Sequence, residues 1–250
     1  MDLSKNQIKL IRSLGQKKFR QKYQYFVAEG SKIVLDTIQK STNIKLIYAL
    51  PDWIEEFESS ITTVKELIVP VSQNELKQIS FLKTPNRALV LLKMPAKEEN
   101  SLVKTSGYHF YADRIQNPGN LGTLIRIADW FGFGSVIASE DSVDFYNEKT
   151  IQSTMGAFLN VDLIRASIES LDYNNLITTS LQGQRLYESQ MPENGIIVIS
   201  NEGQGISAEV LSKSTKDLYI PPHPDSGADS LNASVAAGII ASYVRQSRGI

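Results

Sequence analysis

Apolar residues along this chain follow two periods, one typical of strands and the other of helices. Short apolar runs predict buried strands at 25–28, 44–50, 69–71, 87–93, 108–112, 135–138, 160–164, 176–180, 196–200 and 217–220. Apolar positions spaced three and four apart, with turn residues beside them, predict helices at 3–14, from 31, from 51, and at 73–79, 121–131, 147–158, 166–172 and 230–246. Strands that alternate with helices predict an α/β fold whose parallel sheet is covered on both faces.

One polar stretch, residues 95–100, interrupts this alternation of strands and helices. Its sequence, Pro-Ala-Lys-Glu-Glu-Asn, is typical of an exposed connection. A chain of 250 residues is long enough for two domains, each with its own core. We therefore predict one domain at 1–97, a linker at 98–104 and a second domain at 105–250.

Composition narrows the class of protein. Hydrophobic residues make up 42% of the chain and charged residues 21%, as in soluble globular proteins, and no apolar run approaches the roughly 20 residues that span a membrane. The first residues contain no apolar signal segment, so we expect a cytoplasmic protein. With no cysteine and only two histidines, His109 and His223, the sequence predicts neither disulfides nor a metal site.

Charge is unevenly distributed along the chain, although the formal net charge is only −1. Within residues 1–25, Asp2 is the one acidic residue, and the basic residues are Lys5, Lys9, Arg12, Lys17, Lys18, Arg20 and Lys22. A local basic face can bind phosphates even on a nearly neutral protein. The alternative is an amphipathic helix whose charged side chains are simply solvated.

Three segments in the C-terminal part of the chain combine turns, glycines and polar residues behind apolar strands. The first, DRIQNPGNLG at 113–122, is followed by Arg126. The second is IIVISNEGQG at 196–205, and the third joins LYIPP at 218–222 to SLNAS at 230–234. Asn-Pro-Gly-Asn is a turn sequence, and glycine lets a backbone approach a ligand closely. In order and spacing, the three segments resemble the signature motifs of the SpoU/TrmH family of RNA ribose methyltransferases, which belongs to the SPOUT superfamily.

This resemblance implies a fold, a reaction and partners. The fold would be a parallel-sheet SPOUT domain with a trefoil knot, preceded by a small α/β RNA-binding domain similar to certain ribosomal proteins, whose start the basic segment 15–30 resembles. The reaction would be methyl transfer from S-adenosyl-L-methionine to a ribose 2′-hydroxyl of ribosomal RNA, with transfer RNA as the alternative. Methylation of a base also stays open. The family further implies a homodimer.

The resemblance also assigns roles to individual residues. Those that would act on the reacting groups are Asn120, Arg126, Glu202, Ser230 and Asn232. Those that would contact the cofactor are Thr179, Ser180, Ser200, Glu202, Gly203, Ile220, Ser230 and Leu231. Those that would contact RNA are Lys17, Lys18, Arg20 and Arg126. Because arginine has too high a pKa to act as a base, we expect Arg126 to hold a phosphate and stabilise a developing alkoxide.

Other interpretations of the same residues stay open at this point. Arg126 can be a surface arginine, Ser230 a helix N-cap, and His223, in a loop longer than the usual family pattern, a general base. The segment GQGISA at 203–208 matches a dinucleotide-binding fingerprint, but the next strand ends in prolines rather than in the acidic residue that this motif requires. A catalytically silent RNA-binding or ribosome-assembly protein could also retain the fold.

Overall fold

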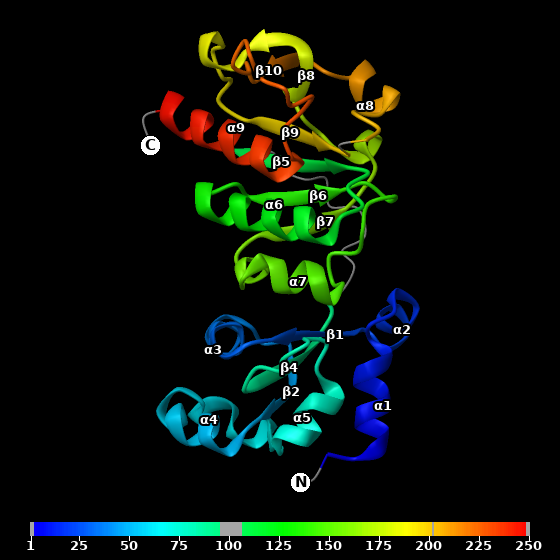
Figure 1. The fold of residues 1–250 in the computed structure, drawn as a ribbon, viewed down its shortest axis with the longest axis vertical. Coiled ribbons are helices and arrows are strands. Elements are labelled where there is room, and N and C mark those ends of the chain that lie inside the picture. Colours follow the sequence, from blue (N-terminus) through cyan, green and yellow to red (C-terminus); the bar gives the residue numbers. More distant parts are fainter. Residues whose placement is uncertain (1–2, 96–106, 202, 249–250) are drawn as a thin grey trace. The chain divides into compact units, whose positions relative to one another are not determined.

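The computed structural model describes residues 3–95, 107–201 and 203–248, which form two compact units (Figure 1). The N-terminal unit contains residues 3–95 together with 146–159. The C-terminal unit contains residues 107–145, 160–201 and 203–248. The predicted linker at 98–104 lies outside the described residues, so the domain boundaries drawn from the sequence stay a prediction.

The N-terminal unit is built on a four-stranded mixed sheet in the order β1-β4-β2-β3. Its strands are β1 (Tyr25–Glu29), β2 (Ile44–Ala49), β3 (Ile68–Pro70) and β4 (Ala88–Lys93). β4 pairs antiparallel with β1 and β2, and β3 pairs parallel with β2. Successive side chains of a strand point to opposite faces, so Val90 and Leu92 enter one core cluster while Leu89 and Leu91 enter another. The sheet therefore carries a hydrophobic core on each face.

The helices of the N-terminal unit are α1 (Lys5–Ser13), α2 (Lys17–Tyr23), α3 (Ser31–Lys40), α4 (Pro51–Glu56), α5 (Gln73–Ile79) and α7 (Glu148–Thr154). The sequence pattern misses α2, which is short and mostly polar. α7 joins this unit because Ile151 packs in the core cluster around Trp53. The ring of Phe26 on β1 also lies 4.7 Å from that of Tyr146, just before α7. Long-range packing, not chain order, thus decides the unit to which α7 belongs.

The C-terminal unit is built on a six-stranded sheet in the order β10-β8-β9-β5-β6-β7, in which every neighbouring pair is parallel. Its strands are β5 (Tyr108–Asp113), β6 (Ser135–Ala138), β7 (Asp162–Arg165), β8 (Leu176–Arg185), β9 (Gly195–Ser200) and β10 (Lys216–Tyr219). β5, at the centre, is buried along its whole length, as expected of a parallel strand covered on both faces. The predicted α/β fold with a parallel sheet is confirmed, and the trefoil knot stays a prediction.

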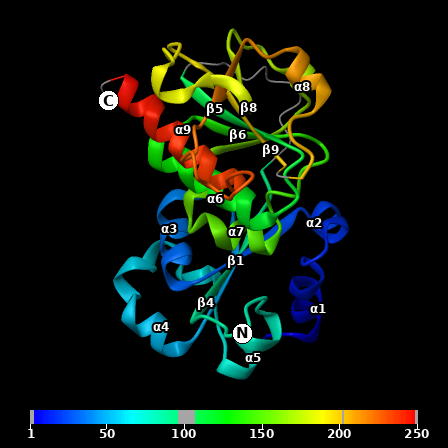
Figure 2. The same ribbon diagram turned by 45° about the horizontal axis from the view of Figure 1, so that its top comes forward.

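Two long helices, α6 (Pro118–Phe131) and α9 (Ala233–Ser247), lie side by side in the C-terminal unit. Figure 2, which is turned by 45°, shows the same pairing. A short helix, α8 (Ala208–Ser212), follows the second motif. In the described part of the chain, no helix is both long and apolar enough to cross a membrane.

Helix boundaries differ from the sequence prediction where turn residues decide them. α6 begins at Pro118 rather than near 121, because Asn117 caps the helix and the fixed φ of proline suits a first helical position. The helix predicted at 166–172 is wrong, since this segment contains only a single 3₁₀ turn, Ile168–Ser170. On both sides of that turn the backbone is extended.

Candidate active site

The first and third motifs meet in a cluster of three polar side chains. Nδ2 of Asn232 donates a hydrogen bond to Oδ1 of Asn120 at 3.1 Å, and the hydroxyl of Ser234 lies 3.2 Å from the same oxygen. Ser234 Oγ is also 2.9 Å from Oδ1 of Asn232. This asparagine junction joins the first turns of α6 and α9, which are 112 residues apart in the sequence. The sequence predicts both asparagines as site residues but not Ser234, which stands in the third motif with Asn232.

Arg126 projects from the helix that carries Asn120. The side chain of Asn117 starts this helix by accepting hydrogen bonds from the backbone N–H groups of Gly119 and Asn120, at 2.8 and 3.3 Å. Arg126 is exposed, and it has no hydrogen bond or ion pair with any other described residue. A guanidinium that no described residue holds is available for a phosphate, which it can bind in a bidentate manner.

Hydrogen bonds join the loop after β5 to the loop after β9. Oδ2 of Asp113, a side chain buried at the end of β5, accepts a hydrogen bond from Ser207 N at 2.6 Å. Arg114 adopts the left-handed backbone region, with φ of 56°, and its Nη2 donates to the carbonyl oxygen of Gly205 at 3.1 Å. Nδ2 of Asn201 returns a bond to the Arg114 carbonyl at 3.2 Å. The first and second motifs therefore form one hydrogen-bonded unit at the carboxyl edge of the sheet.

β8 contains a wide bulge at the residues proposed for cofactor contact. Thr178 pairs with Asp217 of β10, but the next pair is Gln184 with Leu218, so residues 179–183 leave the ladder. The Ser180 hydroxyl donates to Oδ2 of Asp217 at 2.5 Å, and the Thr178 hydroxyl donates to Oδ1 at 2.9 Å. The Ser180 hydroxyl therefore helps to shape the bulge. Of the two predicted cofactor contacts on β8, Thr179 is the better candidate, because the Ser180 hydroxyl already bonds Asp217.

The residues of the third motif differ in their exposure and their roles. Ile220 is half-buried just beyond β10, whereas Ser230 and Leu231 are exposed, Leu231 by 44%. The interpretation of Ser230 as a helix N-cap is wrong. Asn232 caps α9, since its Oδ1 accepts bonds from the N–H groups of Ser234 and Val235 at 3.0 and 3.3 Å. Asn232 thus both caps a helix and holds Asn120.

Three of the strands that carry predicted cofactor contacts are neighbours in the sheet. β10, β8 and β9 are neighbours, and the carboxyl ends of parallel strands lie at a common edge, so Ile220 and Ser200 share it with the β8 bulge. Gly205 has φ of 64°, and no atom lies within 4 Å of the place where a Cβ would stand. The Ser200 and Thr179 hydroxyls and the open backbone at Gly205 are groups that can contact a nucleoside-type ligand. Glu202, the acidic residue of the second motif, lies outside the described residues.

Comparison with known proteins agrees with this geometry. A match to the SpoU rRNA Methylase family spans residues 107–242, more than half of the chain. The chain belongs to the SpoU rRNA methylase family. A second match, to the MRM3-like substrate binding domain, spans residues 5–90. The two matches cover the parts of the chain that stand before and after the polar stretch.

Several relatives of this SpoU protein match it over nearly the whole chain. The 23S rRNA (guanosine(2553)-2′-O)-methyltransferase RlmP of Bacillus subtilis is 28% identical over 98% of each chain. A solved TrmH-family structure from Porphyromonas gingivalis is 31% identical, covers 98% of this chain and 99% of its own, and has a TM-score of 0.87. An AdoMet-bound rRNA methyltransferase from Sinorhizobium meliloti is 25% identical over 98% and 96%, with a TM-score of 0.85.

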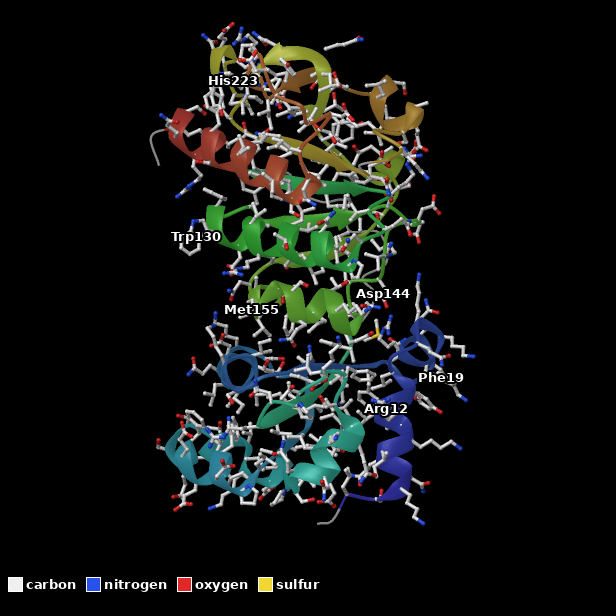
Figure 3. The ribbon with its side chains drawn as sticks, viewed as in Figure 1. Arg12, Phe19, Trp130, Asp144, Met155 and His223 are labelled. Atoms are coloured by element: carbon white, nitrogen blue, oxygen red, sulfur yellow. The ribbon has the colours of Figure 1, made fainter. Side chains whose placement is uncertain are left out.

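The basic residues predicted to contact RNA differ in their placement in this SpoU protein. Lys17 and Lys18 are exposed on α2, and the ammonium of Lys18 lies 4.9 Å from the ring centre of Phe19. Figure 3 shows Phe19 in this region of the chain. Arg20 is only 2% exposed, and its Nη1 donates to the Leu14 carbonyl at 2.7 Å. Because Arg20 is buried, it does not join Lys17 and Lys18 on the exposed basic surface. Its bond to the Leu14 carbonyl instead fixes the turn between α1 and α2.

Two groups that could compete for the role of base do not suit it. His223 lies in the loop before α9, and its side chain is 75% exposed (Figure 3). Its Nδ1 accepts a hydrogen bond from Asp225 N at 3.2 Å. Nothing in the described chain holds this ring against a substrate. Burial, with the carboxylates of Asp113, Glu209 and Glu169, raises the pKa of Tyr111 far above its usual value, so the phenol stays protonated.

The structure bears on the dinucleotide-binding alternative and on the predicted absence of a metal site. The dinucleotide fingerprint at 203–208 leads only into the five-residue helix α8, not into the long helix of a nucleotide-binding βαβ unit. Among the described residues, no group of three or more histidine, aspartate or glutamate side chains could hold a metal ion. The absence of a metal requirement stays a prediction.

Arg165, at the end of β7, supports the first motif, a role that the sequence does not predict. Its guanidinium donates to the carbonyl oxygens of Ser139, Glu140, Ser142 and Val143, at 2.5, 3.2, 3.1 and 2.8 Å. In the same loop, the hydroxyl oxygens of Ser139 and Ser142 accept hydrogen bonds from the backbone N–H groups of residues 114 and 115, respectively. Only the adjacency of β6 and β7 brings these groups together, so no local signal in the sequence could have revealed this role.

Proposed function

We propose that this protein transfers a methyl group from S-adenosyl-L-methionine to a ribose 2′-hydroxyl of ribosomal RNA. The observation that carries the proposal is the asparagine junction of Asn120, Asn232 and Ser234, in a member of the SpoU family. Asn120 shares α6 with Arg126, which is exposed and bonds to no other described residue. The Bacillus subtilis relative is named for this reaction on 23S rRNA, and the Sinorhizobium meliloti relative was solved with AdoMet bound.

The chemistry divides between the cofactor and the protein. When bound, S-adenosyl-L-methionine supplies an electrophilic methyl group on its sulfonium. The protein must hold the ribose hydroxyl in line with that methyl, and orientation of this kind supplies much of the rate. Asn120, held by Asn232 and Ser234, orients the substrate. Arg126 binds a phosphate beside the ribose and stabilises the negative charge that develops on the 2′-oxygen.

Ribosomal RNA takes precedence over transfer RNA in this proposal. Relatives that match most of the chain, from Bacillus subtilis and Streptomyces viridochromogenes, are both named as 23S rRNA 2′-O-methyltransferases. The intact asparagine junction and the exposed Arg126 also argue against a catalytically silent protein. A cytoplasmic location belongs to the same proposal, since bacterial ribosomal RNA is cytoplasmic.

Nucleoside mass spectrometry tests the reaction and the substrate together. Total RNA from wild-type and deletion strains is separated into ribosomal and transfer fractions, and each is digested to nucleosides. We expect one 2′-O-methylnucleoside to disappear from the ribosomal fraction. A loss from the transfer fraction would redirect the substrate, and the loss of a base-methylated nucleoside would contradict ribose transfer. Unchanged nucleosides in both fractions would contradict the enzymatic function.

We propose that the protein acts as a homodimer through α9. Val235, Ile239 and Tyr243 recur every fourth residue and therefore lie on one face of α9. They line an open groove of about 430 Å³ together with Tyr187. On the neighbouring α6, Trp130 is 83% exposed (Figure 3). Large apolar side chains exposed in this way are typical of interfaces, and a second copy of the same face would cover them.

A charge placed in this groove should break the proposed dimer. We expect Val235→Asp together with Ile239→Asp to convert a wild-type dimer into a monomer in sedimentation velocity, because burying two carboxylates costs far more than an apolar contact returns. Leu211→Asp is the matched control, since Leu211 is 52% exposed on α8. A wild-type protein that sediments as a monomer at micromolar concentration would contradict the proposal.

Neutralising Lys17 and Lys18 should weaken RNA binding and flatten its salt dependence. Both side chains are exposed, and each phosphate contact that is lost should reduce the slope of log affinity against log salt by about 0.7–0.9. The measurement is fluorescence anisotropy of a labelled ribosomal RNA fragment at several salt concentrations, with Lys17→Gln/Lys18→Gln. Lys65→Gln/Lys77→Gln, two exposed lysines of the same unit, is the control. Equal slopes for both variants and the wild type would mean that α2 is merely solvated.

A further inference from the structure

A second binding pocket lies in the N-terminal unit, and none of its lining residues belongs to the three motifs. It has a volume of about 210 Å³. Phe81, in the segment after α5, provides an aromatic wall, and Val27 of β1 an apolar one. α7 contributes Glu148, Lys149 and Gln152. An aromatic ring beside hydrogen-bonding groups and a cation is the chemistry that proteins use for an unpaired base and its phosphate.

The carboxylate of Glu148 has unused bonding capacity. Its Oε2 is shielded from solvent and accepts no hydrogen bond from any residue that the structure describes. A shielded acceptor without a donor costs free energy, which a ligand that brings a donor would recover. The other carboxylate of the pocket, Glu29, is already satisfied. It accepts the Ser80 hydroxyl at 2.5 Å and the Phe81 N–H at 2.7 Å, so Glu29 shapes the pocket and Glu148 can recognise a ligand.

Phe81 connects this pocket with the basic helices of the same unit. The guanidinium of Arg12 on α1 lies 5.6 Å from the centre of the Phe81 ring, and its Nη1 donates to the Ser80 carbonyl at 2.9 Å. A Cβ on Gly15 would stand 2.9 Å from Cε1 of Phe81, so the turn between α1 and α2 packs directly against this ring. The pocket therefore adjoins the positively charged surface formed by α1 and α2, where an RNA backbone would lie.

We propose that this pocket binds one unpaired guanine base of the RNA, stacked on Phe81 and read by Glu148. Among the four RNA bases, guanine alone presents two adjacent N–H donors, N1–H and N2–H, on its Watson–Crick edge. An ionised carboxylate, which only accepts hydrogen bonds, is their natural partner. Lys149, exposed at the rim, holds a flanking phosphate. The inference rests on the proposed function in taking RNA as the partner, and it adds a base that anchors the RNA.

Short single-stranded RNAs test this assignment with the full-length protein. Fluorescence anisotropy compares UUGUU, UUIUU, whose inosine lacks the 2-amino group, and UUAUU. We expect the wild type to prefer guanosine over adenosine by about tenfold, the order of one bidentate base contact, with inosine between them. Glu148→Gln should abolish this preference. Glu58→Gln removes the same charge from an exposed site of the same unit and should retain it. Lys149→Gln should lower the affinity for all three RNAs by the same factor.

The two proposals can fail separately. Equal wild-type affinity for UUGUU and UUAUU, or a guanosine preference that survives in Glu148→Gln, would overturn the pocket assignment even if methyl transfer to ribosomal RNA is intact. A preference that Glu148→Gln removes, in a protein that transfers no methyl group to any RNA, would support the pocket and overturn the proposed reaction. Thermal unfolding of each variant confirms that it is folded before binding is compared.

Discussion

Arg126→Ala should reduce methyl transfer by roughly 10²–10³-fold, the usual effect of removing one group that stabilises charge in a transition state. Arg126 is exposed and bonds to no other described residue, so its removal leaves the asparagine junction and the cofactor edge undisturbed. We therefore expect the affinity for S-adenosyl-L-methionine to stay nearly unchanged. Transfer to ribosomal RNA is measured with radiolabelled cofactor, and cofactor binding by isothermal titration calorimetry.

Two further variants separate the roles of Arg126. Arg126→Lys keeps the charge but loses the planar fork, so it should recover only part of the rate, because lysine cannot bind a phosphate in the bidentate manner. Arg245→Ala, near the end of α9, removes an arginine from the same unit and should leave transfer intact. Parallel loss of transfer and cofactor binding in Arg126→Ala would mean that Arg126 serves the structure rather than the reaction.

The sequence predicts the arrangement of this site well where short-range rules decide it. Asn117 and Pro118 combine a helix cap with a first-turn proline, and this pair fixes the orientation of α6 and hence of Asn120. Parallel strands bring their carboxyl ends to one edge, so the motifs that follow β5, β9 and β10 had to meet there. The rule failed at Ser230, because a serine two residues before the true cap, Asn232, satisfies the same local pattern.

Features that depend on distant packing could not be predicted. In the sequence, Arg20 is one more cation in a basic segment. Only the fold shows that its guanidinium donates a hydrogen bond to the Leu14 carbonyl. α7 stands between strands of the C-terminal sheet in sequence, yet Ile151 packs in the N-terminal core. The β8 bulge is equally hidden, because Thr178 and Ser180 acquire their common partner, Asp217, only through pairing with β10.

Arg165→Met should destabilise the protein by about 3 kcal/mol, because three part-buried carbonyl groups lose their donor, and a buried acceptor left unsatisfied costs roughly 1–3 kcal/mol. Burial lowers the pKa of Arg165, against the opposing effect of the Asp144 and Glu140 carboxylates, but an arginine remains charged in a protein. The guanidinium bonds four carbonyl oxygens of the loop between 139 and 143. Urea denaturation of the wild type and the variant measures the change in the free energy of unfolding.

Arg165→Met should also slow transfer in protein that is still folded, because its loop holds the first motif. Ser139 and Ser142 bind the backbone of residues 114 and 115, and these residues lead directly into the cap of α6 and Asn120. In assays at temperatures well below the unfolding temperature, we expect kcat to fall. KM for RNA should change little, since Lys17 and Lys18 are untouched. Arg165→Lys, which can replace only some of the bonds, should recover part of both stability and kcat. A less stable variant with wild-type kcat would mean that Arg165 holds the loop without positioning the site.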